Sequence, residues 1–366
     1  MNKKKGSATI AVLLCAGGLF AISAVAVPNL VNSAVVAKDS TAAPQQDVIL
    51  SLPESAVPVL KVEAPVPVST VEDYLRKNMN QEQMDQIYDS LSKAPEPTVV
   101  GGHDETEAEL NLRTKRHWVL EDQYVYDGIR PQKPMPFEAG QGDLYLDPKT
   151  NTLYVPDRTW TDEELLQLID WNYRQAYAAS LRFPEKPVPP QKYSESEFIM
   201  RAAESVRKLY DADVSKLEIS TSLQQPGFGF PPQQWVYFSP YKERTMRGQG
   251  LEVWKYNVII DPETGVVVDT TAVNLSAIRT PIDGAAAAAI QKDDRWIKEA
   301  TRIVKDKQGE QRKIVKAYLT DTEVNNKRGM VAVDVLLEDG SKYNAELRYP
   351  SMMLRCLIYE PAHKGK

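Results

Sequence analysis

The stretch EVWKYNVIIDPETGVVVDTTAVNL, residues 252–275, predicts a β-hairpin. Side chains of a strand point alternately to opposite faces, and here both faces of the first half are largely apolar or aromatic. The break DPETG at 261–265 has the chemistry of a turn, because Asp can bond the backbone that follows, Pro presets φ and Gly accepts a positive φ. The β-branched run at 266–271 supplies the returning antiparallel strand.

Similar hairpin signals recur along the chain. In GDLYLDPKTNTLYVPD, residues 142–157, the same turn carries Asn151 in place of Gly, and Asn is the next best residue for a left-handed position. In VAVDVLLEDGSKYNAELRY, residues 331–349, Asp339-Gly340 is a two-residue turn signal between alternating runs. Antiparallel hairpins are therefore expected in several parts of the molecule.

The amino terminus has the pattern of an export signal: three lysines, an apolar run from about Ala8 to Val27, and small residues. Residues 1–27 are expected to be a signal peptide or an uncleaved membrane anchor. Ala24 and Ala26 fit a cleavage site, whereas the apolar run is also close to the roughly 20 residues that span a bilayer. Lysines before such a segment favour the cytoplasm, so both readings predict an extracytoplasmic body, secreted or anchored by this segment.

A proline-rich linker is expected at residues 28–69, which contain six prolines and no glycine. Proline at this density favours extended, semi-rigid chain. Two readings stay open, because composition does not separate them: a stalk that holds the folded body away from the membrane or wall, and an unstructured leader.

Charge and cysteine content exclude several classes of protein. The formal net charge is −6, and loss of residues 1–26 with their three lysines and no acid makes it −9. An acidic body argues against nonspecific nucleic-acid binding and offers no polybasic route to anionic lipid, so the membrane is expected to matter only through the amino-terminal segment. Bulky Leu14 directly before Cys15 disfavours lipidation. Only Cys356 then remains, so the fold depends on its hydrophobic core.

Helix-start signals place the remaining elements. Thr70 can cap a helical stretch, and Thr161 and Ser194 each stand three residues before a glutamate, as in a capping box. A helix at 194–210 precedes candidate strands at 216–223, 234–238, 253–260 and 266–274. A second helix at 293–306 precedes candidate strands at 313–320, 330–337, 342–349 and 354–359.

The order of these elements predicts an α+β fold in which antiparallel β-meander sheets each pack against a helix. Two similar modules, 191–280 and 285–362, are expected to follow a smaller helical and hairpin region at 70–190. The weak identity between the two units leaves their duplication a hypothesis.

The first unit resembles a PepSY module. Trp254, Asp261, Thr264 and Gly265 stand in WKYNVIIDPETGVVVD, where this family shows a Trp, alternating apolar residues and a D-x-x-T-G turn. The resemblance implies two PepSY-like modules in a protein of the bacterial cell envelope. It further implies a protein that binds or restrains a protein partner, such as a peptidase, and is not itself catalytic.

Common catalytic motifs are missing from the sequence. It contains no H-E-x-x-H helix, no G-x-S-x-G elbow and no G-x-x-x-x-G-K loop. None of the histidines, His103, His117 and His363, has a second His or Cys at metal-ligand spacing, so no metal, cofactor or catalytic residue is expected. Cys356 lies in an apolar run and is expected to be a buried, inert thiol and not a nucleophile paired with His363. The alternative function is an extracytoplasmic hydrolase whose dispersed carboxylates converge only in the fold.

Four aromatic residues are the candidates for contact with a partner: Trp235, Tyr237, Trp254 and Tyr256. They occupy i, i+2 positions on two neighbouring candidate strands, so each pair shares a face of the sheet. If a face is open, its rings can bind a peptide or a glycan; if the helix at 194–210 covers it, they belong to the core. The oligomeric state and the identity of the partner are not encoded in any pattern that we recognise.

Two further segments have local interpretations. GGHDETEAEL, residues 101–110, is expected to be a solvated acidic loop, because it lacks calcium-loop spacing. WVLEDQYVYDGIRPQKPMP, residues 118–136, is expected to form an irregular cap over a hairpin.

Overall fold

The computed structural model describes residues 70–93, 97–182, 191–226, 231–277, 279–320 and 323–362. The expected export segment and proline-rich linker lie outside the described residues. Within the described ranges, no helix combines the length and the apolar character that crossing a membrane requires.

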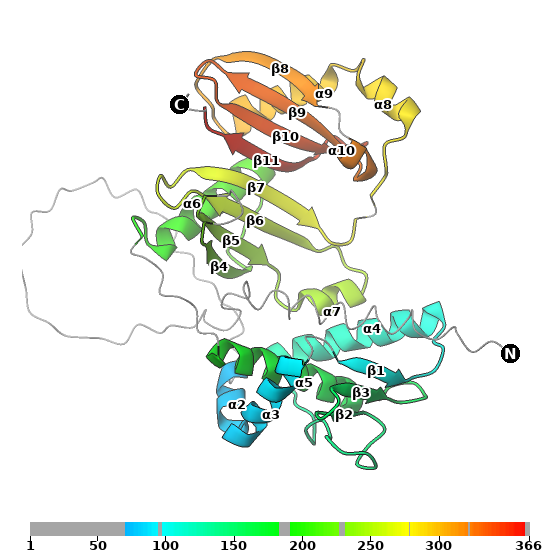
Figure 1. Cartoon of the computed structure of the whole chain (residues 1–366). Coiled ribbons are helices and arrows are strands. Elements are labelled where there is room, and N and C mark those ends of the chain that lie inside the picture. Colours follow the sequence, from blue (N-terminus) through cyan, green and yellow to red (C-terminus); the bar gives the residue numbers. More distant parts are fainter. Residues whose placement is uncertain are drawn as a thin grey trace, which may run out of the picture.

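The first part of the structure, residues 70–182, is called the N-terminal body. It combines a three-stranded sheet of order β1-β3-β2 with helices (Figure 1). β1 runs parallel to β3, and β2 is antiparallel to it. The elements are α2 (Val71–Asn78), α3 (Gln81–Lys93), β1 (Thr98–Gly101), α4 (Glu107–Asp122), the π-helical turn η2 (Gln123–Asp127), β2 (Tyr145–Asp147), β3 (Thr152–Val155) and α5 (Asp162–Arg182).

Side-chain caps fix where these helices begin. The Thr70 hydroxyl accepts a hydrogen bond from the backbone N–H of Asp73 at the start of α2. At α5, Thr161 accepts from the N–H of Glu164, whose carboxylate accepts from the N–H of Thr161 at 2.7 Å. These reciprocal bonds satisfy donors that the first turn of a helix leaves free.

The rest of the chain builds one antiparallel eight-stranded sheet of order β4-β5-β6-β7-β11-β10-β9-β8. In the first half, α6 (Glu195–Tyr210) precedes β4 (Glu218–Gln224), β5 (Gln233–Ser239), α7 (Glu243–Gly248), β6 (Trp254–Ile260) and β7 (Val267–Asn274). In the second half, α8 (Gly284–Ile290), α9 (Arg295–Arg302) and the π-helical turn η3 (Ile303–Lys307) precede β8 (Ile314–Thr320), α10 (Glu323–Lys327), β9 (Met330–Leu337), β10 (Lys342–Arg348) and β11 (Leu354–Glu360).

The two halves join through their last strands. β7 pairs with β11 in antiparallel register over Cys356↔Thr271, Leu357↔Thr270 and Ile358↔Asp269. Beside these pairs, the guanidinium of Arg348 on β10 donates to the carbonyl oxygen of Ala272 on β7 at 2.8 Å. The sequence predicts separate sheets, and the structure differs, because the free edge of each meander satisfies its backbone groups by pairing with the other.

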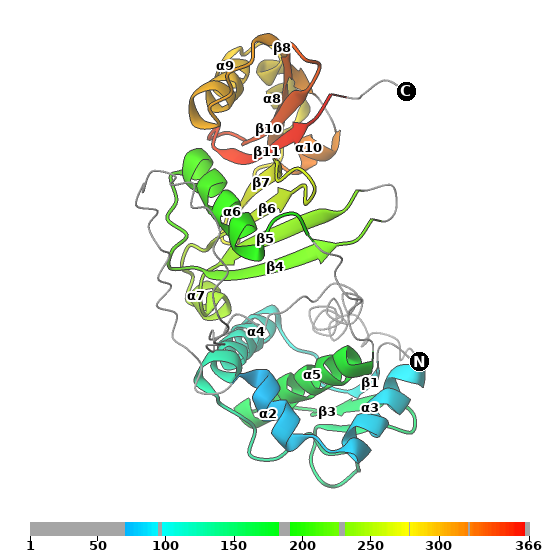
Figure 2. The ribbon, with the colours of Figure 1, turned by 90° about the vertical axis from the view of Figure 1, so that its left-hand side faces the viewer.

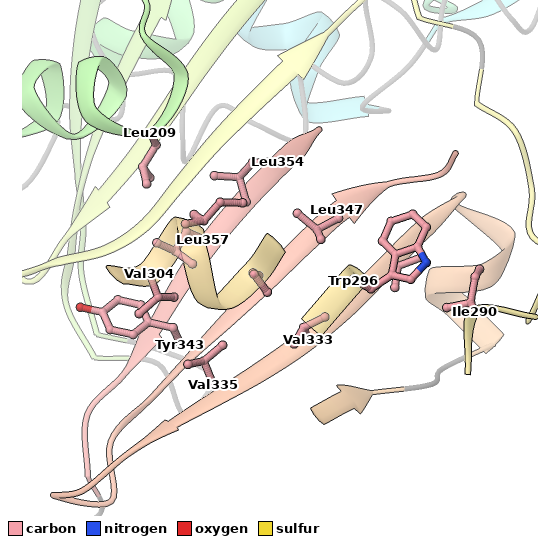
Figure 3. Packing of buried hydrophobic residues seen from close by; sticks show 14 of the residues in the cluster. Leu209, Ile290, Trp296, Val304, Val333, Val335, Tyr343, Leu347, Leu354 and Leu357 are labelled. Atoms are coloured by element: carbon pink, nitrogen blue, oxygen red, sulfur yellow. The ribbon is translucent and has the colours of Figure 1, made fainter. Parts of the chain in front are cut away.

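Helices α6 and α9 cover the same face of this sheet. Thr270 contacts Ser205 of α6 through their hydroxyls at 2.7 Å, and its register partner Leu357 packs into the core beneath α9. Figure 2 shows α6 lying across the strands of the first half. Leu209 of α6 also joins the core of the second half (Figure 3), so one hydrophobic layer continues across the junction.

Two sequence-based expectations about residues 98–160 are correct only in part. Residues 102–106 have no regular structure, as expected of a loop, but α4 begins at Glu107, where Thr106 and Glu109 form a capping box. The segment that begins at Trp118 is helical through η2, which contains Tyr124 and Tyr126, and its remainder, residues 128–136, is irregular and places Met135 against Leu146 of the hairpin. The signal T-E-A-E was present in the sequence and identifies this helix start.

Candidate functional site

The register of the first half separates the four candidate aromatic residues into two pairs. Val236 and Phe238 of β5 point into the core beneath α6, so Trp235 and Tyr237 point to the opposite face. We call the face opposite α6 and α9 the outer face. Trp254 and Tyr256 of β6 share the helix-covered face with Val258, and Tyr256 packs 5.6 Å from the ring of Tyr210 in α6.

Trp254 and Tyr256 therefore take part in packing. Tyr256 belongs to the first-half core, and the guanidinium of Arg348 lies 5.6 Å from the Trp254 ring. Both rings stabilise the joined sheet on the helix-covered face. Trp235 and Tyr237 are therefore the two residues for which contact with a partner is still expected.

The aromatic pair Trp235–Tyr237 forms a flat stack on the outer face. The ring centroids are 5.8 Å apart and the planes differ by 17°. Trp235 pairs with Ser222 on β4 and with Ile259 on β6. Tyr237 pairs with Ser220 on β4 and with Asn257 on β6. The two rings and the four residues opposite them are all half-buried, so this part of the outer face is accessible in part.

One polar atom of this stack lacks a partner. The indole Nε1–H of Trp235 is buried and makes no hydrogen bond to any described residue. A buried donor without an acceptor costs about 1–3 kcal/mol. Because this atom is shielded from solvent, the surface available to another molecule consists of the exposed parts of the two stacked, amphipathic rings.

The corresponding face of the second half is arranged differently. There the carboxylate of Asp334 on β9 accepts hydrogen bonds from Tyr318 at 3.2 Å, Lys342 at 3.1 Å and Asn344 at 2.7 Å. Asp334 is only 5 % exposed, and this network closes on itself. The two halves have the same strand topology, but their outer faces differ: the first half carries the aromatic stack, and the second carries this polar network.

Dispersed carboxylates do converge, at the contact between the N-terminal body and the sheet. Glu121 lies 3.1 Å from Arg244 of α7, and Asp122 accepts from the N–H of Thr245 at 2.6 Å. Tyr126 donates to Glu218 of β4 at 2.7 Å, and Glu243 of α7 pairs with Lys255 of β6. Each acid has a structural partner: Glu121, Asp122 and Glu218 attach the body to the sheet, and Glu243 holds α7 against β6 within the sheet part.

Burial changes the acidities in this contact. Burial raises the pKa of Glu121 and of Asp122, and the nearby Arg244 opposes both shifts. His117 of α4 shows the reverse effect: burial and then the charges of Arg244 and Arg113 lower the pKa of its imidazole to about 4. His117 is therefore neutral at pH 7.

The remaining candidate residues lie apart from one another. Cys356 is buried in β11, and burial raises the pKa of its thiol well above the usual range, which agrees with an inert thiol. His363 lies outside the described residues. His103 precedes α4, and within the described ranges no three His, Cys, Asp or Glu side chains are grouped to hold a metal ion.

Sequence reasoning missed the residues that surround the aromatic pair and those that join the two bodies. No protein-family model, curated protein or solved structure matches the chain.

Proposed function

We propose that this chain is an exported, non-catalytic protein of the bacterial cell envelope that binds or restrains a protein partner, such as a peptidase. The proposal rests on the aromatic pair Trp235–Tyr237, whose stacked and partly exposed rings lie on the outer face. Stacked, amphipathic rings with little conformational entropy to lose are typical of the centres of protein interfaces.

The sequence supports the location and the type of protein. The lysine-flanked apolar segment supports export, and the hallmark turn at 261–265 supports PepSY-like modules. In the structure this turn is well formed: Gly265 has a φ of +70°, and its N–H bonds the carbonyl oxygen of Asp261 at 2.8 Å.

Site-specific photocrosslinking tests the proposal. A benzophenone amino acid replaces Tyr237 in the full chain, expressed in its native envelope, and a second chain carries it in place of Tyr318. Tyr318 is a matched control, because it is also an aromatic residue of the outer face, on β8 in the second half, and is 37 % exposed. We expect a discrete protein adduct at position 237 that Trp235→Ala abolishes.

Two results would contradict the proposal: no adduct at position 237, or adducts of equal yield at 237 and 318. Thermal unfolding of each labelled chain checks that the substitution leaves the fold intact.

A further inference from the structure

A hollow of about 800 Å³ lies in the N-terminal body between α3, α5 and the segment 133–141. Its apolar wall consists of the partly exposed Phe137 and the edges of the core residues Ile87, Met135 and Trp171, none of which is more than 6 % exposed. Phe137 meets Trp171 edge to face, with ring centroids 5.4 Å apart. Volumes of this size, with apolar walls and a few polar groups, are typical of ligand sites.

The wall formed by 133–141 is held in place by hydrogen bonds. The N–H of Lys133 donates to the carboxylate of Glu163 at 3.1 Å, and Gln167 of α5 donates to the carbonyl oxygen of Lys133 at 3.3 Å. The N–H of Leu146 in β2 donates to the carbonyl oxygen of Pro136 at 2.9 Å. Because the wall is tied to both α5 and the sheet, the hollow is formed before any ligand arrives.

The floor of the hollow is an ion pair whose polar atoms are already used. Arg174 donates through Nε to Asp170 at 2.6 Å, through one terminal nitrogen to the carbonyl oxygen of Asn78 and through the other to Tyr74. Tyr124 donates to the second oxygen of Asp170 at 2.9 Å. A pair so engaged offers no available acid, base or nucleophile, which favours binding over catalysis at this place.

The rim of the hollow is rich in side-chain amides. Asn80, Gln83, Gln86, Gln141 and Gln167 all line it. Gln83 uses its oxygen to accept from the N–H of Asn80 at 3.1 Å, which leaves its NH₂ group to donate. The side chain of Gln86 makes no hydrogen bond to any described residue. Gln141 and Gln167 already donate to Glu138 and to the Lys133 carbonyl oxygen, so Gln83 and Gln86 are the amides that match the donors and acceptors of an extended peptide backbone.

The charge of the rim selects among peptides. Glu82 and Glu138 are exposed, line the hollow and form no ion pair with any described residue, and Lys133 is the single cation beside them outside the floor. Two acids against one base favour a peptide that carries a basic residue. The exposed Pro134 and the partly exposed Phe137 suit the rings of proline in an extended polyproline helix, whose carbonyl groups remain free.

We propose that this hollow binds an extended, proline-containing segment of a partner protein with Arg or Lys next to the Glu82 and Glu138 carboxylates. The site is separate from the aromatic pair on the sheet, so the chain has a second, peptide-binding surface on its N-terminal body. It does not depend on the photocrosslinking result at Tyr237.

A phage-displayed library of random decapeptides, selected on the full chain, tests this inference. Counter-selection uses Gln86→Trp, which places a large ring in the hollow. We expect enriched peptides to contain proline together with Arg or Lys, to lose binding to Gln86→Trp and to bind Trp235→Ala/Tyr237→Ala unchanged.

Charge reversal sharpens the test. Glu82→Lys/Glu138→Lys is expected to weaken the best enriched peptide roughly tenfold, measured by fluorescence anisotropy, and replacement of its basic residue by Glu is expected to restore binding. The matched control is Glu263→Lys/Glu323→Lys, which makes the same change of charge at exposed positions of the sheet body and should bind like the wild type. Circular dichroism confirms that each variant is folded.

Enrichment that is equal on Gln86→Trp, a consensus without proline or without a basic residue, or equal effects of the two charge reversals would each overturn the proposal.

Discussion

The hydroxyl of Tyr210, the last residue of α6, lies 2.9 Å from the carbonyl oxygen of Arg355 in β11 and 2.8 Å from that of Thr270 in β7. One side chain from the first half thus bridges the two strands at which the halves meet. Burial raises the pKa of Tyr210 well above its ordinary value, so the hydroxyl stays a donor at all ordinary pH.

Removal of this hydroxyl should weaken the junction. Tyr210→Phe is expected to lower the free energy of unfolding by about 1–3 kcal/mol, because it leaves buried carbonyl groups without their donor. Tyr193→Phe is the control: it removes a hydroxyl that donates to the Thr264 carbonyl oxygen at an exposed site, and about 0.5–1.5 kcal/mol is expected. Urea unfolding measures both, and equal losses would show that the junction does not depend on Tyr210.

The turn at 261–265 packs against α6 through Gly265. A Cβ at this position would lie 2.9 Å from the ring of Tyr193, and φ is +70°. Gly250 has a similar φ of +76° with nothing within 4 Å of such a Cβ. Both Gly→Ala variants should lose roughly 1–2 kcal/mol from backbone strain, and Gly265→Ala should lose only slightly more, because the ends of the Tyr193 and Arg201 side chains that it meets can move aside. Thermal unfolding separates the two effects, and equal losses would argue against the clash.

Acid should destabilise the contact between the N-terminal body and the sheet through His117. Its pKa is lowered to about 4 from 6.5, so the unfolded chain binds the proton more tightly than the folded one. Stability from this group is complete above pH 6.5 and is lost as pH falls from there toward 4. We expect the wild type to lose about 2 kcal/mol more than His117→Gln between pH 7 and pH 5. Parallel pH profiles of the two proteins would contradict this.

The pKa of Asp269 in β7 is shifted upward, so its contribution to stability changes with pH in the direction opposite to that of His117. Burial raises its pKa to about 6 from 3.8, against the hydrogen bond that Thr271 donates to it. The folded chain binds this proton more tightly, so the contribution of Asp269 is favourable at low pH and is lost as pH rises through 6. Asp269→Asn is expected to be more stable than the wild type at pH 7.5 by about 1–3 kcal/mol, with the difference vanishing near pH 4. Denaturant titrations at the two pH values check it, and a constant difference would refute it.

Local chemistry in the sequence predicts the individual elements well. The candidate strand at 330–337 is β9 to the residue, and Asn151 takes the left-handed φ of 49° that its turn requires. Ser194 and Glu197 form the expected capping box of α6. Each of these depends on residues within a few positions of one another, where turn and cap chemistry is decisive.

Contacts between residues that are far apart in the chain could not be predicted from the sequence. Neither the pairing of Thr271 with Cys356 nor the contact of Glu121 with Arg244 leaves a local pattern, because both depend on which edges and surfaces meet after folding. The aromatic residues show the same limit. Alternation places Trp235 with Tyr237, but only the packing of α6 decides which pair remains on the outer face.

The junction of β7 with β11 has a consequence during synthesis. By the time that β7 has left the ribosome, its neighbours β4 to β6 are already present, whereas β11 is the last strand to be translated. Until β11 has been made, the backbone N–H and C=O groups on one edge of β7 are unpaired, and another extended chain can pair with them. A premature stop codon shortly before Leu354 would therefore leave β7 and β10 each with an unpaired edge. We expect such a truncated protein to aggregate, even though most of the polypeptide has been made.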